Sequence, residues 1–197
     1  MSTVKSGGRK RVWVIAAAAV AVVVLAVGLS VFKPWLLFVD VRVDEEIPAV
    51  TASAEQAGPS GSTNEEVPAG PVQLAEGSFI SHEHTTTGTV RIIEKPDGTR
   101  VLALESLDTS NGPDVHVWLS AADVVEGTGG WFTAGSAEYV DLGLIKGNQG
   151  NQVYEISHDV DLSKYKSVDL WCVQFAVSFG AAQLISRDSS SVGATTR

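Results

Sequence analysis

The sequence predicts an all-β domain, an antiparallel β-sandwich or barrel-like fold, preceded by one N-terminal transmembrane helix and a disordered linker. Three observations predict this arrangement. Turn sequences recur every ten to fifteen residues in the C-terminal part of the chain, the segments between them are rich in β-branched and aromatic residues, and a long uncharged run lies near the N-terminus. Closely spaced turns favour antiparallel strands over β-α-β units, which need longer connections.

The uncharged run extends from Val12 to Phe32 and contains 21 residues. As a helix it would cover about 30 Å, the thickness of a bilayer's hydrocarbon core. A cleaved signal peptide would usually have a shorter apolar region, roughly 7–15 residues, followed by a small-residue cleavage site. The run is longer and lacks a convincing site of that kind. We therefore expect a transmembrane signal-anchor helix over residues 12–32.

The distribution of charge predicts how this helix is oriented. Residues 1–40 contain five basic and one acidic side chain, a net charge of +4, whereas residues 41–197 contain nine basic and 22 acidic side chains, a net charge of −13. Because basic residues stay inside, residues 1–11 are expected in the cytoplasm and the C-terminal domain outside it. The predicted location is the cell membrane, with a single pass. The acidic body would repel phosphate backbones, so the cytoplasmic membrane is an expected partner and nucleic acid is not.

The segment after the anchor is predicted to be an acidic, flexible linker over residues 33–72. From residue 44 it is rich in Pro, Gly, Ala, Ser, Thr and Glu and shows neither a helical nor a strand period. Such a composition buries too little apolar surface to offset the entropy of ordering. Residues 73–186 are expected to form the β domain, and residues 187–197 a disordered tail.

Within the β domain, alternating apolar residues and turn sequences indicate the strands. Lys95–Gly98 reads KPDG, a turn that would join the first two strands in a hairpin. Ser120–Asp123 has the spacing of a capping box, which predicts one helical turn ending near Gly127. The expected strands are Thr89–Glu94, Arg100–Glu105, Val115–Leu119, Val153–Ile156 and Val168–Phe179.

The longest predicted strand contains Cys172, the only cysteine of the chain. Side chains alternate across a strand, so every second residue from Trp171 to Phe179 would form one large apolar stripe facing the core. Cys172 would then lie on the opposite, mixed face. The same alternation in the strand 115–119 separates Val115, Val117 and Leu119 from His116 and Trp118.

A single cysteine in an exported domain cannot form an internal disulfide. Cys172 is therefore either a buried, inert residue, a thiol that pairs with another molecule, or a reactive thiol. No second cysteine accompanies it to make a dithiol couple. Electron transfer through Cys172 would need a metal, a cofactor or a partner thiol.

Two histidines provide a candidate metal site. His82 and His84 are two residues apart, and on a strand their imidazoles would face the same way, as half of a copper or zinc site. His116, His158 and Cys172 are the side chains that could complete it. The alternative is a solvated pair of surface histidines.

Sequence patterns of enzymes are scarce. There is no Gly-x-Ser-x-Gly, and the glycine-rich stretch 146–152 lacks the spacing of a phosphate-binding loop, which favours a tight turn between strands. Asp114 is expected to cap a turn. The aromatic residues that could line a ligand pocket are more typical of a core: Trp118, Trp131, Phe132 and Trp171. An enzyme is therefore the less favoured interpretation.

Four stretches together resemble a known family: GSFISHEHTTTGTVRI, NGPDVHVWLS, DLGLIKGNQGNQVYEI and SVDLWCVQFAVSFGAAQL. Their order and spacing are similar to those of the DM-thirteen electron-transfer domain of Skeletor-type proteins, over about residues 76–185. The resemblance implies a β-rich extracytoplasmic module with a redox role that falls here on Cys172. Related domains accompany DOMON domains and b-type cytochromes. This chain has one anchor helix and no haem-binding bundle, so any haem iron would belong to a separate partner protein.

These observations support two functional hypotheses. The first is a membrane-anchored extracytoplasmic redox or electron-transfer accessory that acts through Cys172 with a separate redox protein or cytochrome. The second is a non-catalytic binding or envelope-organising module in which Cys172 is structural.

Overall fold

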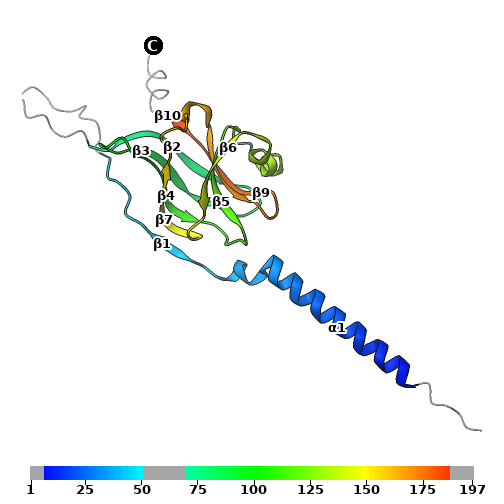
Figure 1. Cartoon of the computed structure of the whole chain (residues 1–197). Coiled ribbons are helices and arrows are strands. Elements are labelled where there is room, and N and C mark those ends of the chain that lie inside the picture. The colour runs from blue at the N-terminus through cyan, green and yellow to red at the C-terminus, as the bar shows by residue number, and fades with distance from the viewer. Residues whose placement is uncertain (1–6, 51–69, 187–197) are drawn as a thin grey trace, which may run out of the picture.

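The computed structural model describes residues 7–50 and 70–186, and Figure 1 shows one helix extending away from a β domain. Helix α1 (Gly7–Phe32) contains no proline, and from Arg11 onward nearly all its side chains are exposed. Its 26 residues exceed the roughly 20 that a bilayer requires. The part from Arg11 to Phe32 is long and apolar enough to span a membrane.

The end of α1 is determined by the residues that follow it. The amide of Lys33 still donates to the carbonyl of Leu29 at 3.0 Å, but Lys33 adopts left-handed backbone angles, φ 42° and ψ 52°. Pro34 has no amide hydrogen and begins a short 3-10 helix in place of a further α-helical turn. The described 3-10 helices are η1 (Pro34–Phe38), η2 (Gly127–Phe132), η3 (Ala134–Ser136) and η4 (Leu162–Lys164).

The rest of the described chain is mostly strand. The strands are β1 (Arg42–Asp44), β2 (Val72–Ser81), β3 (Thr87–Glu94), β4 (Arg100–Asp108), β5 (Val115–Ser120), β6 (Tyr139–Leu144), β7 (Gln149–Ile156), β8 (Ser167–Cys172), β9 (Val177–Gln183) and β10 (Ile185–Ser186). They form one sheet in the order β1-β7-β4-β3-β2-β9-β8-β5-β6, with β10 beside β2.

This sheet curls into a half-barrel with two facing layers (Figure 1). Strand β2 belongs to both layers, because its first part pairs with β3 and its last three residues, Phe79–Ser81, pair with β9. All neighbours are antiparallel except β1 and β7, which are parallel. The predicted all-β, sandwich-like or barrel-like fold is therefore confirmed.

The main core lies between the two layers. Val90, Ile92 and Leu102 enter it from β3 and β4. Val115, Val117 and Leu119 enter it from β5, as the alternation of that strand predicts, while Trp118 lies on the outer face. Burial of such side chains typically contributes about 1.5–3 kcal/mol each, so this interior is the main source of stability.

The segment 40–50 differs from the predicted flexible linker. β1 pairs with β7, Glu45 accepts hydrogen bonds from Lys146 Nζ at 2.7 and 2.8 Å, and Ile47 and Val50 cover the outer face of β3 and β4. Apolar residues among the acidic ones thus give this part a surface to pack against. Residues 51–69, and the predicted tail 187–197, lie outside the described residues.

One glycine makes this packing possible. Gly150 in β7 has φ +97°, and a Cβ atom there would lie 2.0 Å from the carbonyl oxygen of Val43 in β1. Any other residue would both strain the backbone and displace β1. The glycine-rich stretch 146–152, predicted as a turn, is a short turn followed by the start of β7.

The single long strand predicted over residues 168–179 is wrong. The chain forms the hairpin β8–β9 instead, with Val173–Ala176 as the turn and Ala176 at φ 52°. Val173 and Phe175, expected in the core, are exposed in this turn. The turn Val173–Ala176 contains no Gly, Pro, Asn or Asp to indicate a reversal, which is why the alternation across 168–179 is typical of one strand.

The helical turn predicted from the capping box is also wrong. Strand β5 continues through Ser120, whose Oγ accepts a hydrogen bond from the amide of Ala122 at 3.1 Å in a bend. Asp123 is directed toward Lys166, with 2.8 Å between Oδ2 and Nζ. Both side chains therefore have partners that do not require a helix. The hairpin around Lys95–Gly98, in contrast, is confirmed as β3–β4.

Candidate functional site

Cys172 lies in the main core, which corrects its predicted position on the mixed face. It is the last residue of β8 and is fully buried between its register partners Val115 and Val177. The correction has a simple geometric cause. Trp171 and Cys172 do alternate, but the layer that encloses the core lies on the Cys172 side, while Trp171 packs on the outer face.

Burial raises the pKa of the Cys172 thiol, because the thiolate would lose its hydration in this position. The backbone amides of Phe175 and Gln174, and also that of Asp114, act in the opposite direction, whereas the charge of Asp114 raises the pKa further. Backbone amides of the turn after β8 thus favour the thiolate, but burial outweighs them, and the raised pKa keeps the thiol protonated at neutral pH.

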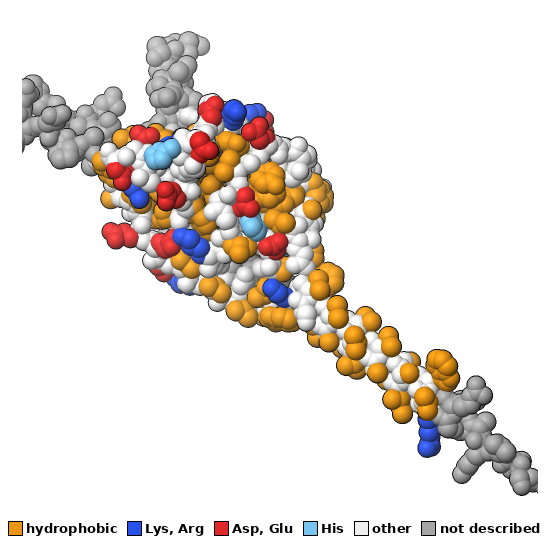
Figure 2. Space-filling view, in the orientation of Figure 1, with side chains coloured by type: hydrophobic (Ala, Val, Ile, Leu, Met, Phe, Trp, Pro, Cys, Tyr) orange, Lys and Arg blue, Asp and Glu red, His pale blue; other side chains and the backbone are white. Residues whose placement is uncertain are grey.

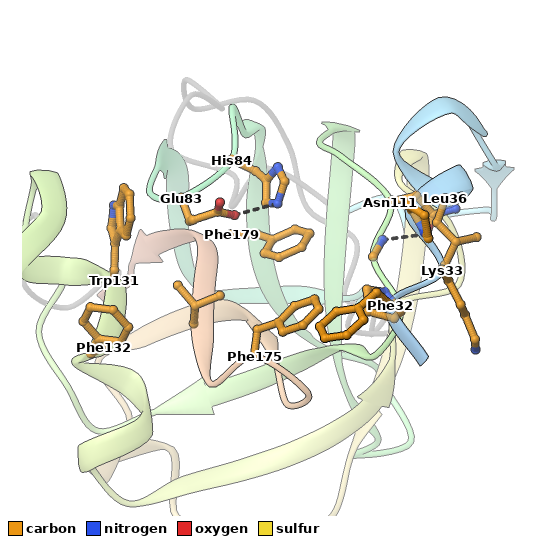
Figure 3. A pocket seen from close by; sticks show the side chains of 14 residues that line it. Phe32, Lys33, Leu36, Glu83, His84, Asn111, Trp131, Phe132, Phe175 and Phe179 are labelled. Carbon is orange, nitrogen blue, oxygen red and sulfur yellow. Dashed lines mark hydrogen bonds and ion pairs between the residues drawn. The ribbon is translucent and has the colours of Figure 1, made fainter. Parts of the chain in front are cut away.

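A cavity of about 520 Å³ adjoins this hairpin (Figure 3). Val177, the register partner of Cys172, lines it together with Phe175 and Phe179. The remaining walls come from Glu83 and His84, from the turn 111–113, from the end of η2 and from the junction between α1 and η1. The volume is within the range of small-molecule sites, roughly 300–1,000 Å³.

The end of α1 contacts the hairpin turn directly. The rings of Phe32 and Phe175 stack with centroids 5.9 Å apart, and Gln174 Nε2 donates to the carbonyl oxygen of Val31 at 2.9 Å. Figure 3 shows Phe32 and Phe175 side by side at the edge of the cavity. The candidate site therefore combines elements from both ends of the chain.

The two histidines of the predicted metal pair lie just beyond the end of β2, in a bend, and face different surroundings. His82 is buried, and both its ring nitrogens have protein partners: Nδ1 is 2.7 Å from Ser178 Oγ and Nε2 is 3.1 Å from the carbonyl oxygen of Val125. His84 packs on Phe179, with 3.9 Å between ring centroids, and lines the cavity. The structure does not bring Cys172 to either of them as a ligand.

No cluster of three or more His, Cys, Asp or Glu side chains with metal-binding geometry occurs in residues 7–50 and 70–186. His116, one of the candidate additional ligands, lies between two aspartates: Nδ1 is 2.9 Å from Asp141 Oδ2 and Nε2 is 3.2 Å from Asp114 Oδ1. Burial works against its charge, but both aspartates favour it, and together they raise its pKa. Asp114, which was expected to cap a turn, pairs with His116 instead. The copper or zinc site at His82 and His84 stays a prediction.

Burial also affects a polar network that the sequence did not indicate. Asp169 is 1% exposed, and burial raises its pKa to about 7, although the 2.8 Å hydrogen bond between its Oδ2 and Ser178 Oγ acts in the opposite direction. The same hydroxyl lies against His82 Nδ1. Burial lowers the pKa of His82. The other oxygen of Asp169, Oδ1, has no hydrogen-bond partner in the described part of the chain.

Hydrogen counting shows that Asp169, Ser178 and His82 Nδ1 need one proton in addition to the hydroxyl hydrogen of Ser178. The carbonyl of Val125 only accepts, so His82 Nε2 carries a hydrogen, and Ser178 has a single hydrogen for two neighbours. If that hydrogen goes to Asp169, His82 Nδ1 must also be protonated. If it goes to His82, Asp169 must be protonated. The opposite directions of the two pKa changes favour a neutral imidazole with a protonated carboxyl group below about pH 7.

The predicted aromatic residues divide between two places. Trp118 and Trp171 stack at 5.2 Å on the outer face of β5 and β8, and Tyr139 stacks on Trp118 at 3.6 Å, so these residues form a second core. Trp131 and Phe132 line the cavity instead. Sequence reasoning therefore found the right residue types but missed Glu83, Phe175 and Phe179 as lining residues. The H-x-H motif flanking Glu83 was the nearest signal.

The family comparison agrees with the four motifs. The family model described as Electron transfer DM13 matches residues 78–184, more than half of the chain, from the end of β2 to the end of β9. The matched part includes Cys172, the hairpin turn and most of the cavity, but not α1. No curated protein and no solved structure matches the chain.

Proposed function

Because the chain belongs to the electron transfer DM13 family, we propose that it is a membrane-anchored accessory of an electron-transfer system, with Cys172 as its redox group. The observation that supports this role most is the position of Cys172. The only thiol of the chain lies in the family-matched part, beneath a turn whose amides face the sulfur, and its strand partner Val177 lines a cavity.

The proposal includes the orientation of the chain. α1 serves as a single-pass anchor in the cell membrane, residues 1–11 stay in the cytoplasm, and the β domain lies outside the cytoplasm. The basic residues that precede the uncharged run Val12–Phe32, and the acidic domain that follows it, support this orientation. Figure 2 shows the apolar side chains that cover α1 and the acidic side chains scattered over the visible face of the domain.

A single thiol needs a second reactant. In the proposed reaction Cys172 and a thiol of a partner molecule form a mixed disulfide, and the two thiols together lose two protons and two electrons. The two electrons pass to a separate redox protein, such as a cytochrome, in which two haem irons accept one electron each, and the two protons are released to solvent. Access to the sulfur requires the turn Val173–Ala176 to move, and two of its side chains, Val173 and Phe175, are already exposed.

A second function is supported by a different observation. Cys172 has no exposed surface and its thiol pKa is raised, which is typical of an inert packing residue. In that case the domain is a non-catalytic binding or envelope-organising module held at the membrane by α1. The two functions differ in what happens to the thiol.

The test is thiol reactivity in the full chain in detergent micelles. With diamide and glutathione in excess, a redox role predicts a mixed disulfide at Cys172 in the folded protein, measured as a mass increase on the peptide that contains it. A structural role predicts modification only after denaturant is added. Cys172→Ala is the matched control for other sites of modification, and near-ultraviolet circular dichroism of the neighbouring Trp171 verifies that the fold is retained.

A further inference from the structure

The cavity beside the β8–β9 hairpin has an unusual combination of walls. Figure 3 shows Trp131 and Phe132 on one side, Phe32 on the other, and Phe175 and Phe179 between them. Aromatic rings on several sides suit a flat ring, because stacked and edge-to-face contacts add about 0.5–1.5 kcal/mol each to the area they bury. The shape therefore favours an aromatic ligand over a branched or globular one.

The hydrogen-bond acceptor considered in this apolar cavity is the carboxylate of Glu83. His84 Nε2 donates to Glu83 Oε2 across 2.6 Å, which orients the carboxylate beside Phe179 (Figure 3). Burial lowers the pKa of His84, against the effect of Glu83, so the imidazole is neutral in most of the physiological range. The ion pair with His84 involves Oε2, and the Glu83 side chain is 36% exposed, so Oε1 can accept a further hydrogen bond. A ligand that bonds to Oε1 must offer a hydrogen, as a hydroxyl group does.

The position of the cavity indicates where its ligand comes from. Phe32, Lys33 and Pro34, at the end of the proposed membrane anchor, form one wall, so the cavity lies next to the point where α1 would leave the bilayer. A lipid-soluble molecule can reach it by lateral diffusion. An acyl chain alone would leave the carboxylate of Glu83 without a hydrogen-bond donor.

We propose that this cavity binds the aromatic headgroup of a membrane-soluble quinol, with Glu83 accepting a hydrogen bond from its hydroxyl group. The ring stacks among the phenylalanines of the hairpin and of α1, and the apolar tail extends toward the bilayer. This inference rests on the proposed membrane anchoring and deepens the proposed electron-transfer role, because a quinol is a carrier of electrons in membranes. It concerns binding alone and assigns no electron-transfer step to the cavity.

The test uses the full chain in phosphatidylcholine nanodiscs and decylubiquinol as the probe. Binding is followed by the indole N–H signals of the tryptophans in two-dimensional NMR. Trp131, which lines the cavity, is expected to shift with saturable dependence on the quinol, whereas Trp118, on the outer face of β5, is not. The dimethyl ether of the same quinol keeps the ring and the tail but lacks the hydroxyl hydrogens, so it is expected to bind about tenfold more weakly.

Two variants examine the role of the carboxylate. Glu83→Met keeps the length of the side chain and removes the acceptor, which predicts about a tenfold loss of quinol affinity. Glu126→Met makes the same change at an exposed residue outside the cavity and should leave the affinity unchanged. Equal binding of quinol and ether, equal affinity of Glu83→Met and the unmodified chain, or no shift of Trp131 would overturn the proposal.

These results separate this proposal from the proposed function. Quinol binding is measured without any thiol reaction, so Cys172→Ser should bind the quinol as tightly as the unmodified chain does. A chain with a reactive Cys172 but no Trp131 shift would lose only the quinol site. A chain that binds quinol but whose Cys172 reacts only after denaturation would lose only the redox role of the thiol.

Discussion

The substitution Asp169→Asn tests whether a buried carboxyl group makes the fold less stable as pH rises. In the folded chain Asp169 has a pKa of about 7, against 3.8 in its ordinary state, a difference of about three units. Each unit corresponds to about 1.4 kcal/mol, so ionised Asp169 destabilises the fold by about 4 kcal/mol relative to the protonated form. The Asn side chain of the variant has the same shape but does not ionise, so its fold is not destabilised by a buried charge.

The sign follows from proton binding. Because the pKa is raised in the folded state, the folded chain binds more protons than the unfolded chain between pH 3.8 and about 7, and stability falls with rising pH in this window. Below pH 3.8 Asp169 is protonated in both states and contributes nothing to the pH dependence. Above pH 7 the loss is complete and constant. The free energy of unfolding should therefore decrease by up to about 1.4 kcal/mol per pH unit across the window relative to Asp169→Asn.

The assay is urea unfolding of both proteins, as full chains in the same nonionic micelles, at half-unit steps from pH 4 to pH 8.5. Other titrating groups, His116 among them, occur in both proteins, so the difference between the two curves isolates Asp169. His82, which shares the hydroxyl of Ser178 with Asp169, is the group whose titration could change with the substitution, and its ring signals should be followed by NMR. A pH-independent difference between the two proteins would refute the reasoning.

Three further predictions follow from single contacts. His116→Gln removes an imidazole whose pKa is raised by two flanking aspartates. The stability that His116 contributes should therefore be present below pH 6.5 and be lost as pH rises through the raised pKa, which urea unfolding of both proteins would measure. Gly150→Ala should detach β1 and lower the free energy of unfolding by about 1–3 kcal/mol. Gly143→Ala is the control and should cost less, because Gly143 also has a positive φ, +112°, but an added Cβ there would have no atom within 4 Å; thermal unfolding compares the two variants. Lys146→Met should raise the pKa of Glu45, measured by carboxyl NMR, with less than about 1 kcal/mol of stability lost because the pair is partly exposed.

Sequence patterns correctly predict those parts of the fold that are determined by neighbouring residues, such as turns and the alternation within one strand. The turn at Lys95–Gly98 contains the residues that fix a reversal, and the alternation in β5 separates core residues from outer ones correctly. The hairpin β8–β9 could not be found in this way. Its turn contains two residues that prefer strands, Val173 and Phe175, and none that favours a reversal. Ala176 is held at a positive φ by the pairing of the flanking strands rather than by its own preference.

The candidate site could not be predicted from local patterns, because the residues that form it are far apart in the sequence. Cys172, His82 and His84 could be identified by residue type, but the partners that define their chemistry lie far away along the chain. Ser178 is 96 residues from His82, and the contact between Gln174 and Val31 joins residues 143 apart. No periodicity reports such pairings, because they depend on how the whole sheet curls. The resemblance to the family therefore predicted the domain well and its cavity not at all.

The turn between β8 and β9 connects the features that matter for function. Gln174 holds the end of α1, Phe175 forms a wall of the cavity, and the amides of both residues face the sulfur of Cys172. A movement of this turn would expose the thiol, change the cavity and release α1 together, because the three contacts belong to consecutive residues. If the cavity is occupied, the ligand contacts Phe175 and holds the turn closed. Ligand binding and thiol reactivity are then expected to oppose each other, which makes the rate of Cys172 modification, with and without ligand, a direct measure of their coupling.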